Sequence, residues 1–213
     1  MTSPCDGLRA ALAAAPVIAI LRSSSATRFA EVTDALLASG VRAAEFTLTT
    51  PGALDALREY AADAPPGLAL GAGTVTTPAD ARAAVEAGAT YLITPATCTD
   101  VIAEAVRLGV PVLPGAYTPT EILTAWRAGA TMVKLFPAAT GGPEHLKAVR
   151  APLPDVPLVP TGGVGAADAP AYLAAGATAL GIGGPLVGDA CEGGSLAALT
   201  DRAAAFLDGI RPR

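Results

Sequence analysis

The stretch AWRAGATMVKLF, residues 125–136, joins an alanine-rich helical segment through Gly129 to a short apolar run. A glycine directly after a helix can adopt the left-handed conformation that ends helices. The aliphatic residues that follow are typical of a strand covered on both faces. The same helix–glycine–strand unit occurs four more times, as LLASGVRAAEFTL (36–48), AVEAGATYLIT (84–94), AVRLGVPVLPG (105–115) and YLAAGATALGIG (172–183).

This repeated unit predicts a parallel sheet whose strands are connected by helices. Eight strands are expected, at residues 17–21, 42–48, 68–72, 90–94, 110–113, 131–135, 157–160 and 178–182. Eight such units in 213 residues predict an α/β fold, a (β/α)8 TIM barrel formed by one compact domain over residues 1–213 with an N-terminal helix. A doubly wound open sheet is the alternative. Its dinucleotide-binding form is disfavoured because no GxGxxG motif opens a helix after the first strand.

Two helix starts are marked by capping residues. Thr77 precedes Pro78, the form of an N-cap followed by proline at the first helical position. Thr118 precedes Pro119 in the same way, and Glu121 completes the pattern of a capping box.

Composition excludes several classes of protein. The net charge is −5 and no cluster of basic residues is present, so neither nucleic acid nor a membrane surface is an expected partner. Cys5, Cys98 and Cys191 lie far apart, which predicts free thiols in a reducing cytoplasm. The apolar residues 10–21 are too few to span a membrane, and Asp6 stands where a signal peptide would carry basic residues.

Lys134 lies inside the apolar run TMVKLFP. Lysine is rarely buried unless it is paired or functional, and burial penalises the ammonium form. A neutral amine is a nucleophile that can form a Schiff base with a carbonyl substrate. The alternative is a structural lysine whose stem packs at a strand end while its head reaches water.

In a barrel the carboxyl ends of the strands form the active face. Polar residues and glycines collect at these expected ends, namely Arg22, Glu45, Thr74, Thr94, Pro95, Gly115, Lys134, Phe136, Thr161, Gly162, Gly163, Gly183 and Gly184. Glu45 interrupts another apolar run, where a carboxylate needs a partner or a function. It fits a general acid or base, and the alternative is structural charge balance with Arg22 or Lys134.

The glycine pairs at 162–163 and 183–184 follow the seventh and eighth strands, where barrel enzymes often bind phosphate through backbone N–H groups. Simple tight turns are the alternative. His145, the sole histidine, is expected at the surface or at a helix cap, and Trp126 in the core. One histidine without clustered carboxylates does not predict a catalytic metal. Tyr117 and Thr118 could line the mouth of the barrel or be ordinary loop residues.

Taken in order, VIAILRSSS, EFTLTTP, GAGTV, the TP of LITPATC, PGAYTPTE, VKLFPA, PTGGV and GIGG resemble the class I 2-keto-3-deoxy-6-phosphogluconate (KDPG) aldolases and the related 4-hydroxy-2-oxoglutarate (KHG) aldolases. The resemblance extends over residues 17–187. It implies an aldehyde-lyase of carbohydrate metabolism, in the Entner–Doudoroff pathway, that needs no metal or other cofactor. It also implies a small-molecule 2-keto sugar acid as substrate and a homotrimeric assembly.

The resemblance also implies roles for individual residues. These are Schiff-base formation by Lys134, acid–base catalysis by Glu45, substrate carboxylate binding by Arg22, Thr74, Pro95 and Thr49, packing beside the lysine by Phe136, and phosphate binding by Gly162, Gly163, Gly183 and Gly184.

Two positions depart from the family pattern. Many relatives have T-L-R-T after the glutamate, whereas this chain has T-L-T-T, so Thr49 stands in place of an arginine that binds the carboxylate. Arg22 is therefore the expected cation. Relatives often carry a serine in the eighth-strand loop, but Pro185 follows the glycine pair here, which weakens the expected preference for phosphate.

Several functions stay open from the sequence. The same chemistry could act on KHG or on the galactonate epimer of KDPG. A phosphate-binding barrel isomerase or synthase, or a phosphate-ester binder without catalysis, would share the glycine turns. The presence of both Lys134 and Glu45 argues against the binder without catalysis.

Overall fold

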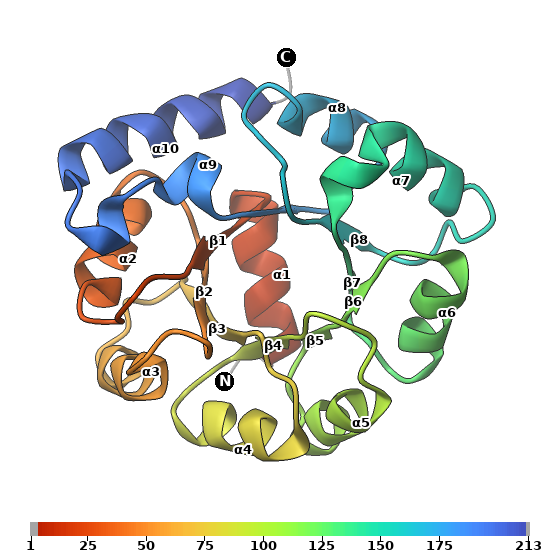
Figure 1. The fold of residues 1–213 in the computed structure, drawn as a ribbon, viewed down its shortest axis with the longest axis horizontal. Coiled ribbons are helices and arrows are strands. Elements are labelled where there is room, and N and C mark those ends of the chain that lie inside the picture. The colour runs from red at the N-terminus through yellow and green to blue at the C-terminus, as the bar shows by residue number, and fades with distance from the viewer. Residues whose placement is uncertain (1–3, 212–213) are drawn as a thin grey trace.

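The computed structural model describes residues 4–211, which form a ring of helices around parallel strands (Figure 1). The strands are β1 (Val17–Leu21), β2 (Ala43–Thr47), β3 (Ala69–Gly73), β4 (Tyr91–Ile93), β5 (Val112–Leu113), β6 (Gly115–Ala116), β7 (Val133–Leu135), β8 (Leu158–Pro160) and β9 (Leu180–Ile182). The helices are α1 (Pro4–Ala14), α2 (Phe29–Ala38), α3 (Ala53–Ala62), α4 (Pro78–Glu86), α5 (Thr99–Leu108), α6 (Pro119–Arg127), α7 (Gly142–Arg150), α8 (Ala169–Ala174), α9 (Gly184–Val187) and α10 (Leu196–Ile210), with short 3-10 turns η1 (Ala138–Thr140) and η2 (Ala190–Glu192).

The strands pair in parallel within two curled sheets. One sheet has six strands in the order β5-β4-β3-β2-β1-β9, and the other has three in the order β6-β7-β8. An isolated parallel bridge between Thr161 and Gly181 connects the end of β8 to β9. The predicted α/β fold with parallel strands and an N-terminal helix is thus confirmed.

All eight predicted strands are present, with ends within two residues of those expected. The segment at 110–113 differs most, because it starts at Val112 and a separate strand, β6, follows it. Pro114 stands between the two strands and has no N–H group to contribute to a ladder.

The local signals that mark helix ends are also confirmed. The five repeat glycines, Gly40, Gly88, Gly109, Gly129 and Gly176, all have positive φ angles between 71° and 104°. Thr77 and Thr118 each form a capping box, with Asp80 and Glu121 respectively as partners.

Two apolar clusters hold the fold together. The larger lies between the strands and the surrounding helices. The smaller combines Leu8, Ala11 and Leu12 of α1 with residues at or near the starts of the strands, among them Tyr91. Helix α1 also contacts β2, β3 and β4 and crosses the ring of strands (Figure 1). It therefore covers the amino-terminal end of the strands and leaves the carboxyl end open for a site.

Across residues 4–211, no helix combines the length and the apolar character that crossing a membrane requires.

Candidate active site

A pocket of about 220 Å³ opens at the carboxyl ends of the strands. It brings together ten of the eleven residues that the sequence assigns to the site, namely Arg22, Glu45, Thr74, Pro95, Lys134, Phe136, Gly162, Gly163, Gly183 and Gly184. These residues lie on or directly after seven different strands. The parallel arrangement therefore places residues far apart in sequence around one cavity.

Lys134 is the central residue of β7, and its backbone pairs with Gly115 on one side and Val159 on the other. The residue is 8% exposed. Its Nζ atom lies 4.9 Å from the centroid of the Phe136 ring, within the range of a cation–π contact. The amine is thus held inside the pocket. A purely structural lysine would instead extend its head into solvent.

Glu45 lies on β2 and is 1% exposed. Burial raises the pKa of its carboxyl group, whereas the nearby charges of Lys134 and Arg22 act in the opposite direction. Within residues 4–211 no group donates a hydrogen bond to its Oε2 atom. A buried carboxyl group with a raised pKa and an oxygen available for a new partner fits a group that gains and loses a proton.

The space for this carboxylate depends on Gly73 at the end of β3. A Cβ atom on Gly73 would overlap the Glu45 carboxyl group. Below it, Gly71 leaves room for the Tyr91 ring, whose hydroxyl donates to the Ala44 carbonyl at 2.7 Å. Two glycines of one strand therefore create the positions of two side chains from neighbouring strands.

Arg22 follows β1 and donates through Nη2 to the Thr74 hydroxyl at 3.2 Å. Thr74 has a φ angle of 59°, the one positive value among non-glycine residues in the described part of the chain. This conformation is unfavourable for a β-branched residue, and such strain collects at functional sites. It turns the Thr74 hydroxyl toward the guanidinium group at the rim of the pocket.

The Pro95 turn is supported by a buried threonine. The Thr94 hydroxyl donates to the Ala96 carbonyl and also lies 3.4 Å from the N–H of Gly115. A Cβ atom on Gly115 would lie against the Pro95 carbonyl, so a larger residue there would displace the turn.

The glycine turn after β8 presents backbone N–H groups. Gly162 and Gly163 have φ angles of 89° and 77°, which favour glycine. No acceptor within residues 4–211 binds the N–H group of either residue. Consecutive unpaired N–H groups of this kind form an anion-binding concavity.

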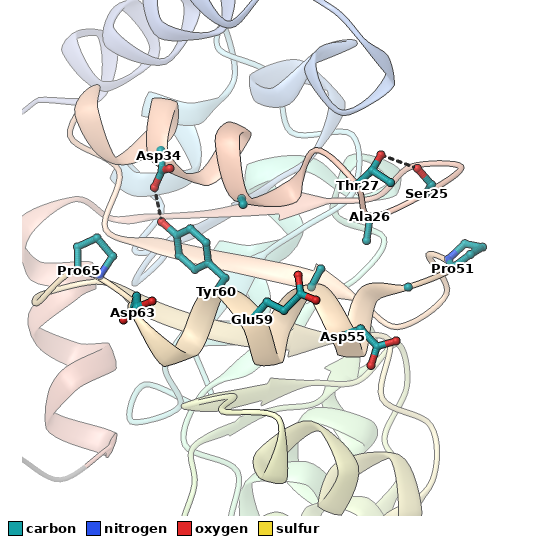
Figure 2. A pocket seen from close by; sticks show the side chains of 13 residues that line it. Ser25, Ala26, Thr27, Asp34, Pro51, Asp55, Glu59, Tyr60, Asp63 and Pro65 are labelled. Carbon is teal, nitrogen blue, oxygen red and sulfur yellow. Dashed lines mark hydrogen bonds between the residues drawn. The ribbon is translucent and has the colours of Figure 1, made fainter.

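A second hollow, about 540 Å³, lies between α2 and α3 (Figure 2). Its lining includes Asp34, Asp55, Glu59 and Asp63, and none of its lining residues is basic. The Tyr60 hydroxyl donates to Asp34 at 2.7 Å across this groove. Lys134, Glu45 and Arg22 instead come together in the smaller pocket at the strand ends, which is therefore the candidate active site.

The sequence model described as KDPG and KHG aldolase matches residues 8–200. The chain belongs to the KDPG and KHG aldolase family. It is 42% identical over 160 residues to the 2-dehydro-3-deoxy-phosphogluconate aldolase of Pseudomonas aeruginosa, covering 75% of this chain and 71% of that protein. It is 34% identical over 203 residues to the KHG/KDPG aldolase of Escherichia coli, covering 94% of each chain.

Among solved structures, the chain is similar to the KDPG aldolase of Legionella pneumophila. The TM-score is 0.84 at 29% sequence identity, over 97% of this chain and 98% of that one. That structure is described as holding pyruvate captured at low pH as a covalent carbinolamine intermediate.

In this member of the KDPG and KHG aldolase family, one residue predicted for the site lies outside the pocket. Thr49 is exposed and is not among the pocket residues. Strand β2 ends at Thr47, and the turn that follows directs Thr49 outward while Thr50 is buried. The structure therefore does not bring Thr49 into the pocket, whereas Arg22 lines it.

The remaining predictions concern residues outside the pocket. His145 is partly buried in the first turn of α7, where its ring stacks on Tyr117 with the ring centroids 4.5 Å apart and its Nε2 atom lies 3.0 Å from the Tyr117 carbonyl oxygen. Trp126 packs against the core as expected. The three cysteines are free thiols.

Sequence reasoning missed Ile20, Val164 and Gly181 as pocket residues, and it placed Thr161 and Pro185 at strand ends without including them in the predicted site. Thr161 carried a usable signal, because it directly precedes the Gly162–Gly163 pair at a strand end. A Cβ atom on Gly181 would overlap the Thr161 side chain, a contact that only the three-dimensional structure reveals.

Proposed function

We propose that this protein is a class I aldolase that cleaves KDPG to pyruvate and glyceraldehyde 3-phosphate. The observation that carries the proposal is the convergence of a buried lysine, Lys134, and a buried carboxylate, Glu45, in one pocket beside Arg22. This combination provides a nucleophile, a proton-transfer group and a cation for the substrate carboxylate.

Lys134 attacks the C2 ketone of the substrate, and loss of water gives a cationic iminium. The iminium withdraws electrons when the C3–C4 bond breaks, which divides one difficult cleavage into easier steps. Removal of the proton from the C4 hydroxyl releases the aldehyde and leaves an enamine on the lysine. Protonation of the enamine at C3, followed by hydrolysis, releases pyruvate.

Glu45 serves as the group that accepts and returns the proton, directly or through a water molecule. Its raised pKa brings the carboxyl group closer to the operating pH, where a group can both take up and give back a proton. The positive charge that develops on Lys134 lies close enough to favour the ionised form of Glu45.

Arg22, Thr74 and the turn at Pro95 bind the substrate carboxylate, and Phe136 packs beside the Schiff base. The N–H groups of Gly162, Gly163, Gly183 and Gly184 bind the phosphate at the other end of the substrate. Holding both ends aligns the bond to be cut with the iminium.

A second substrate has a specific observation in its favour. Pro185 supplies no N–H group, and the only cations among the pocket residues are Arg22 and Lys134. A substrate with a small distal carboxylate, such as KHG, therefore loses less here than a phosphorylated one. Comparative kcat/KM values on KDPG, KHG and the galactonate epimer of KDPG decide the preference.

The decisive experiment is covalent trapping of pyruvate with borohydride, read by intact-mass and peptide mass spectrometry. The chain has only two lysines, Lys134 and Lys147, so a single modified lysine is readily assigned. We expect the adduct on Lys134, none in Lys134→Ala, and unchanged trapping in Lys147→Ala, a substitution at an exposed position of α7.

An adduct that persists in Lys134→Ala would contradict the assignment. The absence of any adduct in the wild-type protein would favour the isomerase, synthase or binding alternatives.

We propose further that the two sheets form one closed (β/α)8 barrel. In support, the N–H of Gly115 on β6 donates at 3.1 Å to the carbonyl of Thr94, which directly follows β4. Strand β6 therefore extends the pairing that β5 makes with β4. The Thr161–Gly181 bridge supports closure between β8 and β9. Residues 1–213 form its single domain. An experimental structure with an open edge at either place would contradict the closed barrel.

Family membership and composition support a proposal for assembly and location. We propose a homotrimer in the cytoplasm, where free cysteines stay reduced. Light scattering coupled to size-exclusion chromatography tests the trimer, for which a monomeric mass is the contrary result.

A further inference from the structure

Two buried threonine hydroxyls brace the backbone on both sides of Arg22. Thr47 donates to the Leu21 carbonyl at 3.0 Å, and the Thr50 hydroxyl accepts from the Ser23 N–H at 3.2 Å. Thr47 and Thr50 are 0% and 2% exposed. Their two oxygens lie 3.1 Å apart.

The direction of these bonds is determined by their partners. Thr47 gives its only hydroxyl hydrogen to Leu21, so Thr50 is the donor in the bond between the two threonines. The result is a continuous path from the Ser23 N–H through both hydroxyls to the Leu21 carbonyl. The pairing of β1 with β2 ends at Leu21 and Phe46, so these hydroxyls take over where the ladder stops.

Arg22 needs such support because little else fixes it. Its side chain is long and the residue is exposed, and the Thr74 hydroxyl is its one hydrogen-bond partner within residues 4–211. The position of its guanidinium group therefore depends on where the backbone between Leu21 and Ser23 is held.

We propose that Thr47 and Thr50 are positioning residues that set the place of Arg22 and thereby the affinity for the carboxylate of the keto acid. This inference rests on the proposed function, in which Arg22 binds that carboxylate. Neither threonine lines the pocket, so both act through Arg22.

The test is Thr50→Val, which keeps the side-chain shape and removes the acceptor of the Ser23 N–H. Trapping on Lys134 is measured as a function of pyruvate concentration. We expect the half-saturating concentration to rise about five- to tenfold, the scale of a lost hydrogen bond that leaves a backbone donor unpaired. Thr50→Ser keeps the hydroxyl and restores a value near that of the wild type.

Three controls separate positioning from a general structural effect. Thr33→Val removes another buried hydroxyl, which bonds to the Phe29 carbonyl on α2, and should change the half-saturating concentration by less than about twofold. Pyruvamide, which lacks the negative charge, should show no shift in Thr50→Val. In an Arg22→Met background, Thr50→Val should add less than about a twofold effect.

The outcomes distinguish this inference from the function on which it rests. If Arg22→Met weakens pyruvate binding but Thr50→Val does not, or if pyruvamide shifts as much as pyruvate, the positioning role is overturned and the aldolase proposal stands. If Arg22→Met has no effect, the carboxylate role of Arg22 fails and the positioning role fails with it. Thr47→Val, which frees the Leu21 carbonyl on the other side, provides a second variant if Thr50→Val does not fold.

Discussion

The Glu45 carboxyl group occupies the space that a side chain on Gly73 would fill. The two residues lie on neighbouring strands, and β2 and β3 pair with Glu45 opposite Gly71 and Thr47 opposite Gly73. The place of the Glu45 carboxyl group, the proposed acid–base group, is therefore set by a residue that has no side chain.

Gly73→Ala should displace this carboxyl group and slow the cleavage. We expect kcat to fall about 100-fold or more, the usual contribution of a positioned acid or base, with a smaller change in KM. Steady-state kinetics on KDPG measure the effect. The matched control is Gly209→Ala on α10, where a Cβ atom meets nothing within 4 Å. It should leave activity intact and stabilise the fold by up to about 1 kcal/mol.

Glu45 should make the protein less stable as pH rises. Its pKa in the folded chain is raised by burial, so between the unfolded and the folded pKa the folded state binds more protons than the unfolded state. The free energy of unfolding therefore decreases through that window. Urea unfolding of the wild type and Glu45→Gln across the acid-to-neutral range should show the Gln variant gaining relative stability toward neutral pH. A constant difference between the two proteins would contradict the raised pKa.

Gly162→Ala should damage both stability and activity, because the residue has a φ angle of 89° and a Cβ atom would lie 2.9 Å from the Phe136 ring. We expect a loss of about 1–2 kcal/mol from the left-handed backbone and a reduced kcat/KM as Phe136 moves. Gly67→Ala carries similar strain at φ 86° with nothing within 4 Å. That control should lose comparable stability and keep its activity. Equal kinetic effects in the two variants would argue against a specific role of Gly162 at the pocket.

Thr118→Ala should remove the capping box at the start of α6 and cost about 1 kcal/mol of unfolding free energy. Thr120→Ala, at an exposed position two residues further along the same helix, should stay within about 0.5 kcal/mol of the wild type. Urea titrations of both variants provide the comparison, and similar losses in the two would show that the cap contributes little.

The features that the sequence predicted are those encoded locally. The repeat glycines end helices because of their own conformational freedom, and the TPTE segment caps a helix through groups three residues apart. Lys134 and Glu45 stood out because charged residues inside apolar runs are rare, and the topology then brings strand ends together.

The features that the sequence did not predict depend on contacts between distant segments. Nothing in TLTT shows that Thr50 turns inward and Thr49 outward, since this depends on where β2 ends. The left-handed conformation of Thr74 and the fit of Glu45 over Gly73 likewise arise only when neighbouring strands pair. The Pro114 interruption between β5 and β6 was visible as a proline, but its effect on the sheet was not.

Helix α1 gives the cavity a closed floor. Leu8 and Leu12 pack beneath the strands together with Tyr91, whose ring fills the interior next to Gly71. The substrate and both products must therefore enter and leave through the same opening, at the carboxyl ends of the strands. In the proposed mechanism the aldehyde departs first, since the three-carbon remainder is still bound covalently to Lys134, and release is sequential. Accumulated pyruvate consequently competes with fresh sugar acid for the vacant amine.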